Sequence, residues 1–168
     1  MTPIVKVLDK VLRVLCVVFF AALVIVVVLQ VFTRQVLSNP LTWTTVAAQY
    51  LFVWLSLLGS AWVFSEKEHI AVDFLTRALK INSKKAMEVF VNVIIGLFGA
   101  LVLLWGGIRG VGITWSQNVS GLPVSVGMMY LALPISGAII VFYALHHIIE
   151  ATQGRGLPSL DEEIREAV

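Results

Sequence analysis

Three histidines and one cysteine are among the residues of this chain whose side chains could ligate a metal or act as a nucleophile. The histidines are His69, His146 and His147. Two histidines at equal depth on different helices can ligate a haem iron, but adjacent residues point about 100° apart on a helix, so His146 and His147 do not share a metal face. The single Cys16 excludes an internal disulfide and a cysteine-based metal cluster. No catalytic triad, phosphate-binding loop or metal-ligand spacing accompanies these residues, so we expect neither an enzyme nor a bound cofactor.

The composition explains why reactive groups are so few. Of 168 residues, 59% are hydrophobic and 13% are charged, with a mean hydropathy of +0.95. A soluble domain is roughly 45–50% apolar and about 25% charged. The chain is therefore expected to be an integral membrane protein that contacts lipids. A water-soluble globule, a disordered chain and a nucleic-acid-binding module are excluded.

Four apolar segments have the length of a membrane-spanning helix, which needs roughly 20 residues. They cover residues 14–33, 46–64, 89–108 and 127–145. We expect an all-α integral membrane fold with four transmembrane helices, forming a single membrane domain over residues 1–168. The polar groups inside these spans are mainly the neutral amides Gln30, Gln49 and Asn92, and no acid or base lies near a middle. Such amides favour hydrogen bonds between helices over ligand binding.

The basic residues predict the orientation of the spans. Ten of the 12 Lys and Arg residues precede the first span, follow the fourth, or lie between the second and third. Only Arg34 and Arg109 fall on the other side. Cytoplasmic connections carry the excess of Lys and Arg, so both termini are expected in the cytoplasm.

The third helix is predicted to be unusually long. If it runs from Met87 to Trp115 it covers about 43 Å at 1.5 Å per residue, which requires a tilt or a projection beyond the membrane. Small residues at Gly96–Ala100, and at Gly59–Ala61 in the second span, permit close helix approach. Packing within the chain and contact with another subunit are equally good explanations of these patches.

The connection between the second and third spans predicts a short amphipathic helix over about residues 69–80. Its apolar residues Ile70, Phe74 and Leu75 share one face, and Asp73 lies on the other within pairing distance of Arg77. Such a helix lies in the membrane surface, or it packs against the cytoplasmic face of a partner. Residues 154–168 are expected to form a cytoplasmic tail.

Aromatic and basic residues mark the outer ends of the spans. Trp43 and Trp115 suit the interfacial belt, where an indole is half wet, although substrate binding is an alternative role. Arg34 and Arg109 lie close enough to the outer surface to snorkel into it. The alternative for each arginine is a pair with a carboxylate of another subunit.

Two stretches are similar to a known family. One runs from Phe52 to Ala61 and continues from His69 to Leu75, and the other joins Gly121-Leu122-Pro123 to the segment Met129–Ile135. Together with Arg34 and Trp43, they resemble the small membrane subunit of tripartite ATP-independent periplasmic (TRAP) transporters, the DctQ-type family. The resemblance covers nearly the whole chain. One departure is that Thr44 and Thr45 follow Trp43 where the family often has acidic residues.

The resemblance implies a small scaffold subunit of a sodium-coupled importer of an organic acid in the bacterial inner membrane. The implied partners are a large multi-span subunit, forming a heterodimer with this chain, and a periplasmic substrate-binding protein. The coupling sodium ions are expected in the large subunit. The residues that we expect at a subunit interface or as interfacial anchors are Arg34, Trp43, Gln49, Gly59, His69, Asp73, Phe74, Arg109, Trp115 and Pro134.

Two other functions are alternatives at this stage. A small autonomous exporter of the multidrug type works as a homodimer and needs a membrane-embedded carboxylate, which the predicted spans do not contain. A membrane anchor subunit of a redox enzyme needs histidines paired across helices. The sequence does not identify the transported acid.

Overall fold

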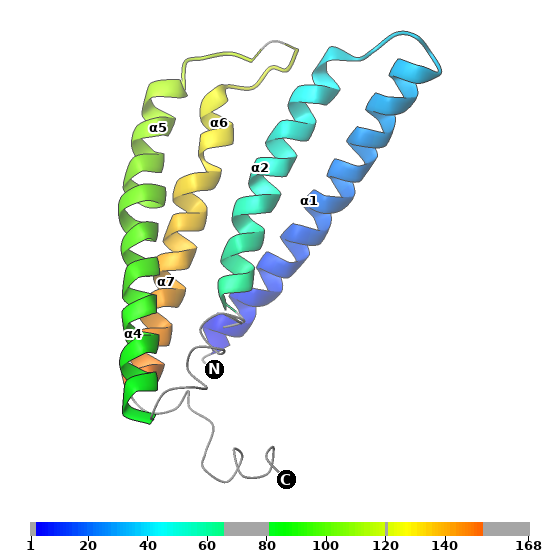
Figure 1. Cartoon of the computed structure of the whole chain (residues 1–168). Coiled ribbons are helices and arrows are strands. Elements are labelled where there is room, and N and C mark those ends of the chain that lie inside the picture. Colours follow the sequence, from blue (N-terminus) through cyan, green and yellow to red (C-terminus); the bar gives the residue numbers. More distant parts are fainter. Residues whose placement is uncertain (1–2, 66–80, 120, 153–168) are drawn as a thin grey trace, which may run out of the picture.

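A computed structural model of the chain describes residues 3–65, 81–119 and 121–152, and all of its long elements are helices (Figure 1). Helix α1 spans Pro3–Gln35 and α2 spans Thr42–Ser65. The third long helix is continuous through three elements, α4 (Ile81–Phe98), the π-helical η1 (Gly99–Gly106) and α5 (Gly107–Thr114). The fourth consists of α6 (Val126–Tyr130) and α7 (Ala132–Thr152).

All four long helices have the length and composition to cross a membrane, which confirms the expected all-helical fold. The candidate spans are Val5–Gln35, Thr42–Ser65, Ala86–Thr114 and Val126–Thr152. Each is longer than the apolar segment predicted for it, because backbone hydrogen bonds continue a helix beyond its most apolar stretch. The third span has 29 residues, the length expected for a helix from Met87 to Trp115. The predicted amphipathic helix over 69–80 and the tail over 154–168 lie outside the described residues.

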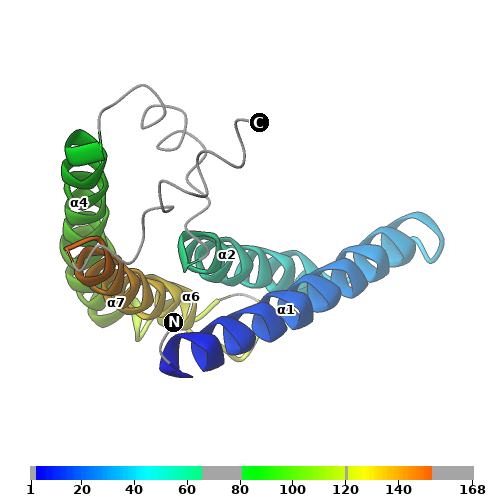
Figure 2. The same ribbon diagram turned by 90° about the horizontal axis from the view of Figure 1, so that it is seen from below.

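The four helices lie side by side in one curved row and do not close into a bundle (Figure 2). Helix α1 packs on α2, α2 packs on α7, and α7 packs on α4 and η1. Among the described elements, the backbones of α1 and α4 do not approach each other. The first residues of α1 and the last residues of α7 lie at the same end of the row, which we call the terminal end (Figure 1). We call the opposite end, where residues 36–41 and 115–125 connect the helices, the loop end.

Glycines line the seam between the third and fourth long helices. A Cβ atom at Gly107 would lie 2.7 Å from Pro134 Cδ, and one at Gly137 would lie 2.7 Å from Leu103 Cβ. Further contacts of the same kind pair Gly96 with Ala144, Gly99 with Ile140, and Gly110 with Tyr130. The helices therefore touch at backbone distance, as membrane helices do when small residues face each other. These glycines serve packing within the chain.

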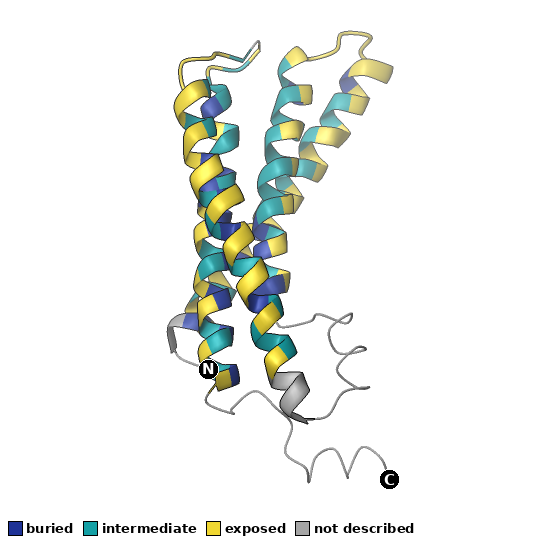
Figure 3. Cartoon of the chain, turned by 60° about the vertical axis from the view of Figure 1, so that its left-hand side comes forward, coloured by how far each residue is buried: buried dark blue, intermediate teal, exposed yellow. Residues whose placement is uncertain are grey.

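The apolar core lies mainly in the half of the row nearer the terminal end (Figure 3). Its buried members are Val5, Leu12, Cys16, Leu58, Ala61, Phe64, Leu103, Ile140, Tyr143 and Ala144. Toward the loop end, α2 is joined to the fourth long helix by single contacts. Tyr50 Oη donates to the Ser125 carbonyl at 3.0 Å, and Trp54 Nε1 donates to the Met128 carbonyl at 3.3 Å. These two hydrogen bonds connect α2 to the start of the fourth long helix.

Candidate interface and polar sites

A buried polar cluster lies at the terminal end of the row, where α1, α2 and α7 meet. The hydroxyl of Tyr143, which is fully buried, donates a hydrogen bond of 2.5 Å to Asp9 Oδ1. His147 is buried, and its ring centroid lies 5.3 Å from that of Phe64 and 6.3 Å from that of Tyr143. Ser65, also buried, closes the last turn of α2 by donating to a backbone carbonyl. The cluster ties α1 to α7, although their backbones are not in contact.

This cluster was not predicted from the sequence. Asp9 lies among the basic residues Lys6, Lys10 and Arg13, and nothing in this charged stretch distinguishes it. The Asp9–Tyr143 bond joins residues 134 positions apart, and no periodicity links them. Membrane depth was the one signal that could have brought Asp9 and Tyr143 together. An even number of spans places the start of the first helix and the end of the last on the same side of the membrane.

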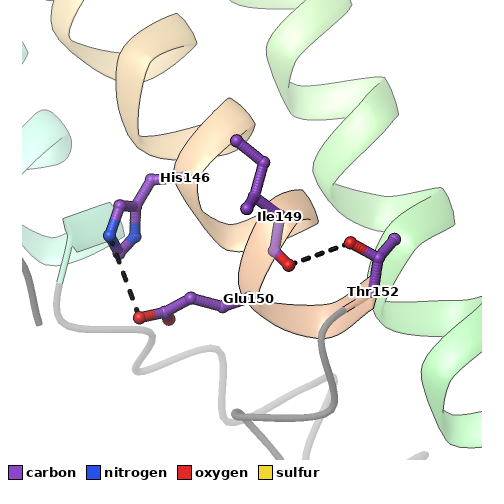
Figure 4. Close-up of polar contacts among 4 residues, drawn as sticks. All are labelled: His146, Ile149, Glu150 and Thr152. Carbon is purple, nitrogen blue, oxygen red and sulfur yellow. Dashed lines mark hydrogen bonds and ion pairs between the residues drawn. The ribbon is translucent and has the colours of Figure 1, made fainter.

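The other histidine of α7 interacts with an acid on its own helix. His146 Nε2 lies 3.8 Å from Glu150 Oε1, one turn later, and Thr152 Oγ1 donates to the Ile149 carbonyl at the helix end (Figure 4). The planes of the His146 and His147 rings are 71° apart. Within the described ranges, no group of three His, Cys, Asp or Glu side chains is placed to hold a metal ion. His69 lies outside these ranges.

The three amides inside the spans have different environments. Gln30 Nε2 donates to Thr45 Oγ1 at 2.9 Å and joins α1 to α2, as expected. Asn92 is buried, but its Nδ2 donates to the Glu88 carbonyl of its own helix at 2.9 Å. Its Oδ1 has no hydrogen-bond partner among the described residues. Gln49 is exposed on α2. The expectation of a bond between helices is therefore confirmed for Gln30, whereas Asn92 bonds within its helix.

The predicted interfacial residues are found near the loop end. Arg34 is exposed in the last turn of α1, and Trp43 is half-buried at the start of α2. Trp43 touches the connection between the third and fourth long helices, where Gly121 has a φ of 96° that only glycine adopts easily. Arg109 is exposed with its guanidinium carbon 4.7 Å from the Trp105 ring centroid. Trp115 is exposed and packs one side against Gly127.

The remaining predicted residues are spread over the chain. Pro134 is buried in the glycine seam, in contact with Gly107. Gly59 does not belong to this seam, because a Cβ atom there would have nothing within 4 Å. Asp73 and Phe74 lie outside the described residues. The described members of the predicted set are thus not brought together into one pocket, and the geometry favours surfaces for helix packing over a reaction site.

Comparison with known proteins identifies the family to which this chain is similar. Residues 23–154 match the family described as "Tripartite ATP-independent periplasmic transporters, DctQ component". The sialic acid TRAP transporter small permease protein SiaQ of Vibrio cholerae is 24% identical over 144 residues, which cover 85% of this chain and 82% of that protein. The sialic acid TRAP transporter permease protein SiaT of Haemophilus influenzae is 27% identical over 129 residues, covering 73% of this chain.

The two relatives differ greatly in length. The aligned segment makes up only 20% of SiaT, so this chain spans about a fifth of that permease protein. The family match covers well over half of this chain, and it includes the second, third and fourth candidate spans and the last part of the first, residues 23–35. A member of this family is a membrane transport component and not an enzyme. The chain belongs to the DctQ family, the small permease subunits of TRAP transporters.

Proposed function

We propose that this chain is a small scaffold subunit of a sodium-coupled, binding-protein-dependent importer of an organic acid, and that it moves no solute alone. The observation that carries the proposal is the single curved row of helices. A solute path inside one chain needs helices on all sides of a polar site near the middle of the membrane. One layer of helices does not surround such a path, so the carboxylate site and the sodium ligands belong to a large partner subunit.

The substrate class rests on the family and on the named relatives. SiaQ and SiaT carry sialic acid in their names, at 24% and 27% identity to this chain. We therefore propose a carboxylate-bearing organic acid, with its identity determined by the binding protein and the large subunit. We also place the terminal end of the row in the cytoplasm, because Lys6, Lys10 and Arg13 lie there.

Transport by purified components tests the scaffold function. Liposomes under an inward sodium gradient would receive this chain alone, the chain with its large subunit, or both with the binding protein, and uptake of labelled organic acids would be measured. We expect uptake only in the third case. Sodium-driven uptake by the isolated chain would contradict the scaffold function and favour an autonomous transporter.

Thiol labelling in intact cells tests the orientation. In a Cys16→Ala background, Asn39→Cys and Asn118→Cys, both in exposed loop-end positions, should react with a membrane-impermeant maleimide added from the periplasm. Thr152→Cys, exposed at the terminal end, should not react. The reverse pattern would place the termini in the periplasm.

A further inference from the structure

One side of α2 is left uncovered by the other described helices. Its residues are Gln49, Phe52, Ser56, Gly59, Ser60 and Val63, and we call them the open face of α2. The five side chains of this set are exposed, and Gly59 is partly buried but borders open space, with nothing within 4 Å of a Cβ atom there. At 3.6 residues per turn, spacings of three and four residues keep all six on one side of the helix.

The other helices of the row pack on the opposite side of α2. Trp54 stacks on Phe19 of α1 with ring centroids 5.9 Å apart, and it bonds to the backbone of α6. Leu58 and Ala61, also on that side, are buried in the core. The open face is therefore not a gap left by loose packing inside the chain, because the packed side of α2 already has its neighbours.

The open face of α2 carries polar groups in the middle of a membrane span. Ser56 lies 14 residues after Thr42, the first residue of α2, which is about 21 Å along the helix axis. Ser60 Oγ donates to the Ser56 carbonyl at 2.8 Å. No hydrogen bond to the Gln49 amide or the Ser56 hydroxyl is found within the described part of the chain. A side-chain amide facing hydrocarbon without a partner is unfavourable, so this face is poorly suited to lipid.

The free face of α1 shows what a lipid-facing surface of this protein looks like. Its exposed residues at spacings of three and four are all aliphatic, namely Val7, Val11, Val14, Val18, Ala21, Ile25 and Val28. It includes no hydroxyl, amide or glycine. The contrast between two neighbouring helices of similar depth indicates that the two faces meet different surroundings. Small and hydrogen-bonding residues in a membrane are typical of helix–helix contacts.

The length of a relative identifies the kind of partner. In the permease protein SiaT, the segment similar to this chain makes up 20% of the polypeptide, so the large remainder is held beside it covalently. A soluble binding protein does not reach Ser56, which lies about 21 Å from the loop end of α2. The occupant must be a membrane helix.

We propose that the open face of α2 is the docking surface for a membrane helix of the large permease subunit, an inference that rests on the proposed scaffold function. Gly59 lets the two backbones approach closely, and the Gln49 amide and Ser56 hydroxyl hydrogen-bond to polar groups of the incoming helix. The partner helix therefore covers one broad side of the row and leaves the outer side of α1 to lipid.

Co-purification of co-expressed subunits tests the surface. Gly59→Leu fills the open space and should lower the yield of large subunit by about fivefold or more, since overpacking a close contact typically lowers affinity by at least that factor. The thermal unfolding midpoint of the isolated small subunit should not fall, because a Cβ atom at this position meets nothing within 4 Å and leucine has a higher helix propensity than glycine. Gly112→Leu is the matched control, since a Cβ at Gly112 also meets nothing within 4 Å but lies on α5. It should leave the yield of large subunit unchanged and should not lower the midpoint.

Photo-crosslinking identifies the occupant independently of the leucine variants. In a Cys16→Ala background, a benzophenone maleimide on Ser60→Cys should join this chain to the large subunit, whereas the same probe on Val28→Cys of α1 should not. Crosslinked dimers of this chain would show that a second copy occupies the face and would overturn the proposal. An intact complex that neither crosslinks from Ser60→Cys nor responds to Gly59→Leu would overturn it too. If the unmodified chain fails to co-purify with a large subunit at all, the scaffold function itself fails.

Discussion

Glycines bring the third and fourth long helices together at backbone distance, whereas α1 and α2 are joined through side chains. Helix α1 contains no glycine, and the one glycine of α2, Gly59, faces open space. The α1–α2 contact uses the Phe19–Trp54 stack and the Gln30–Thr45 hydrogen bond instead. Burial follows the same division, with 39% of the most apolar window of the fourth span buried against 6% in the first.

This difference matters because lipid gives helices little hydrophobic reason to associate. Close van der Waals contact between backbones is one of the main sources of stability for helix pairs in a membrane. The glycine seam provides that contact along most of the third and fourth helices. Helix α1, at one edge of the row, depends on a few specific links, one of which reaches past α2 to α7. The packing of the first half of the chain is therefore expected to tolerate changes in helix position more easily than that of the second half.

The largest expected effect comes from glycine-to-alanine substitutions, one in the glycine seam and one in α2. Gly137→Ala would place a Cβ 2.7 Å from Leu103 Cβ and 2.8 Å from the Leu104 backbone nitrogen, so we expect a loss of about 2–3 kcal/mol in unfolding free energy. Gly59→Ala has open space and gains up to about 1 kcal/mol from helix propensity. Reversible unfolding in detergent micelles measures both. Effects of equal sign and size would remove the distinction between the two halves.

A smaller effect is expected at the link between α1 and α7. Tyr143→Phe removes the hydroxyl that donates to Asp9 and should cost about 1.5–2 kcal/mol, at the low end of the range for hydrogen bonds to charged groups. A double-mutant cycle with Asp9→Asn isolates the bond, because once one partner is changed the second change should cost less. Strictly additive losses would mean that the two residues stabilise the fold separately.

The smallest effect is expected in the α1–α2 contact. Phe19→Leu removes the ring that stacks on Trp54 with an interplanar angle of 3°, and we expect a loss of about 1 kcal/mol. Phe20→Leu is the control, because Phe20 is the next residue and its side chain is exposed. The same unfolding assay compares them. If Phe20→Leu costs as much as Phe19→Leu, the stack does not define the contact.

Hydropathy and length were sufficient to predict the elements of this fold. Four apolar segments became four long helices, and the 29-residue third span was anticipated because its apolar chain continued beyond Ile108 to Trp115. Hydropathy and helix length depend on residues that are close together in the sequence, so they can be predicted without knowing the tertiary structure. The π-helical turns of η1 have no comparable signal in the sequence.

The neighbours of each helix were not predictable in the same way. Gly106 and Gly107 are adjacent and chemically identical, but Gly107 is buried against Pro134 while Gly106 is exposed. Rotation of the helix about its own axis decides between them, and that rotation is determined by packing against α7. Of the predicted interface residues, Gln49 and Gly59 fall on one uncovered face, whereas Pro134 lies inside the seam. The spacing of Gln49 and Gly59 predicts that they share one side of α2, but it does not predict that this side is uncovered.

The bond between Asp9 and Tyr143 also constrains how the protein is made. Because 134 positions separate the two residues, a ribosome adding about 5–20 residues per second needs roughly 7–27 s between them. For most of that interval α1 is complete, while the residue of α7 that binds its carboxylate has not been added. The first helix therefore reaches its final place only after α7 has been synthesised, and until then Asp9 needs water or lipid headgroups as its partner.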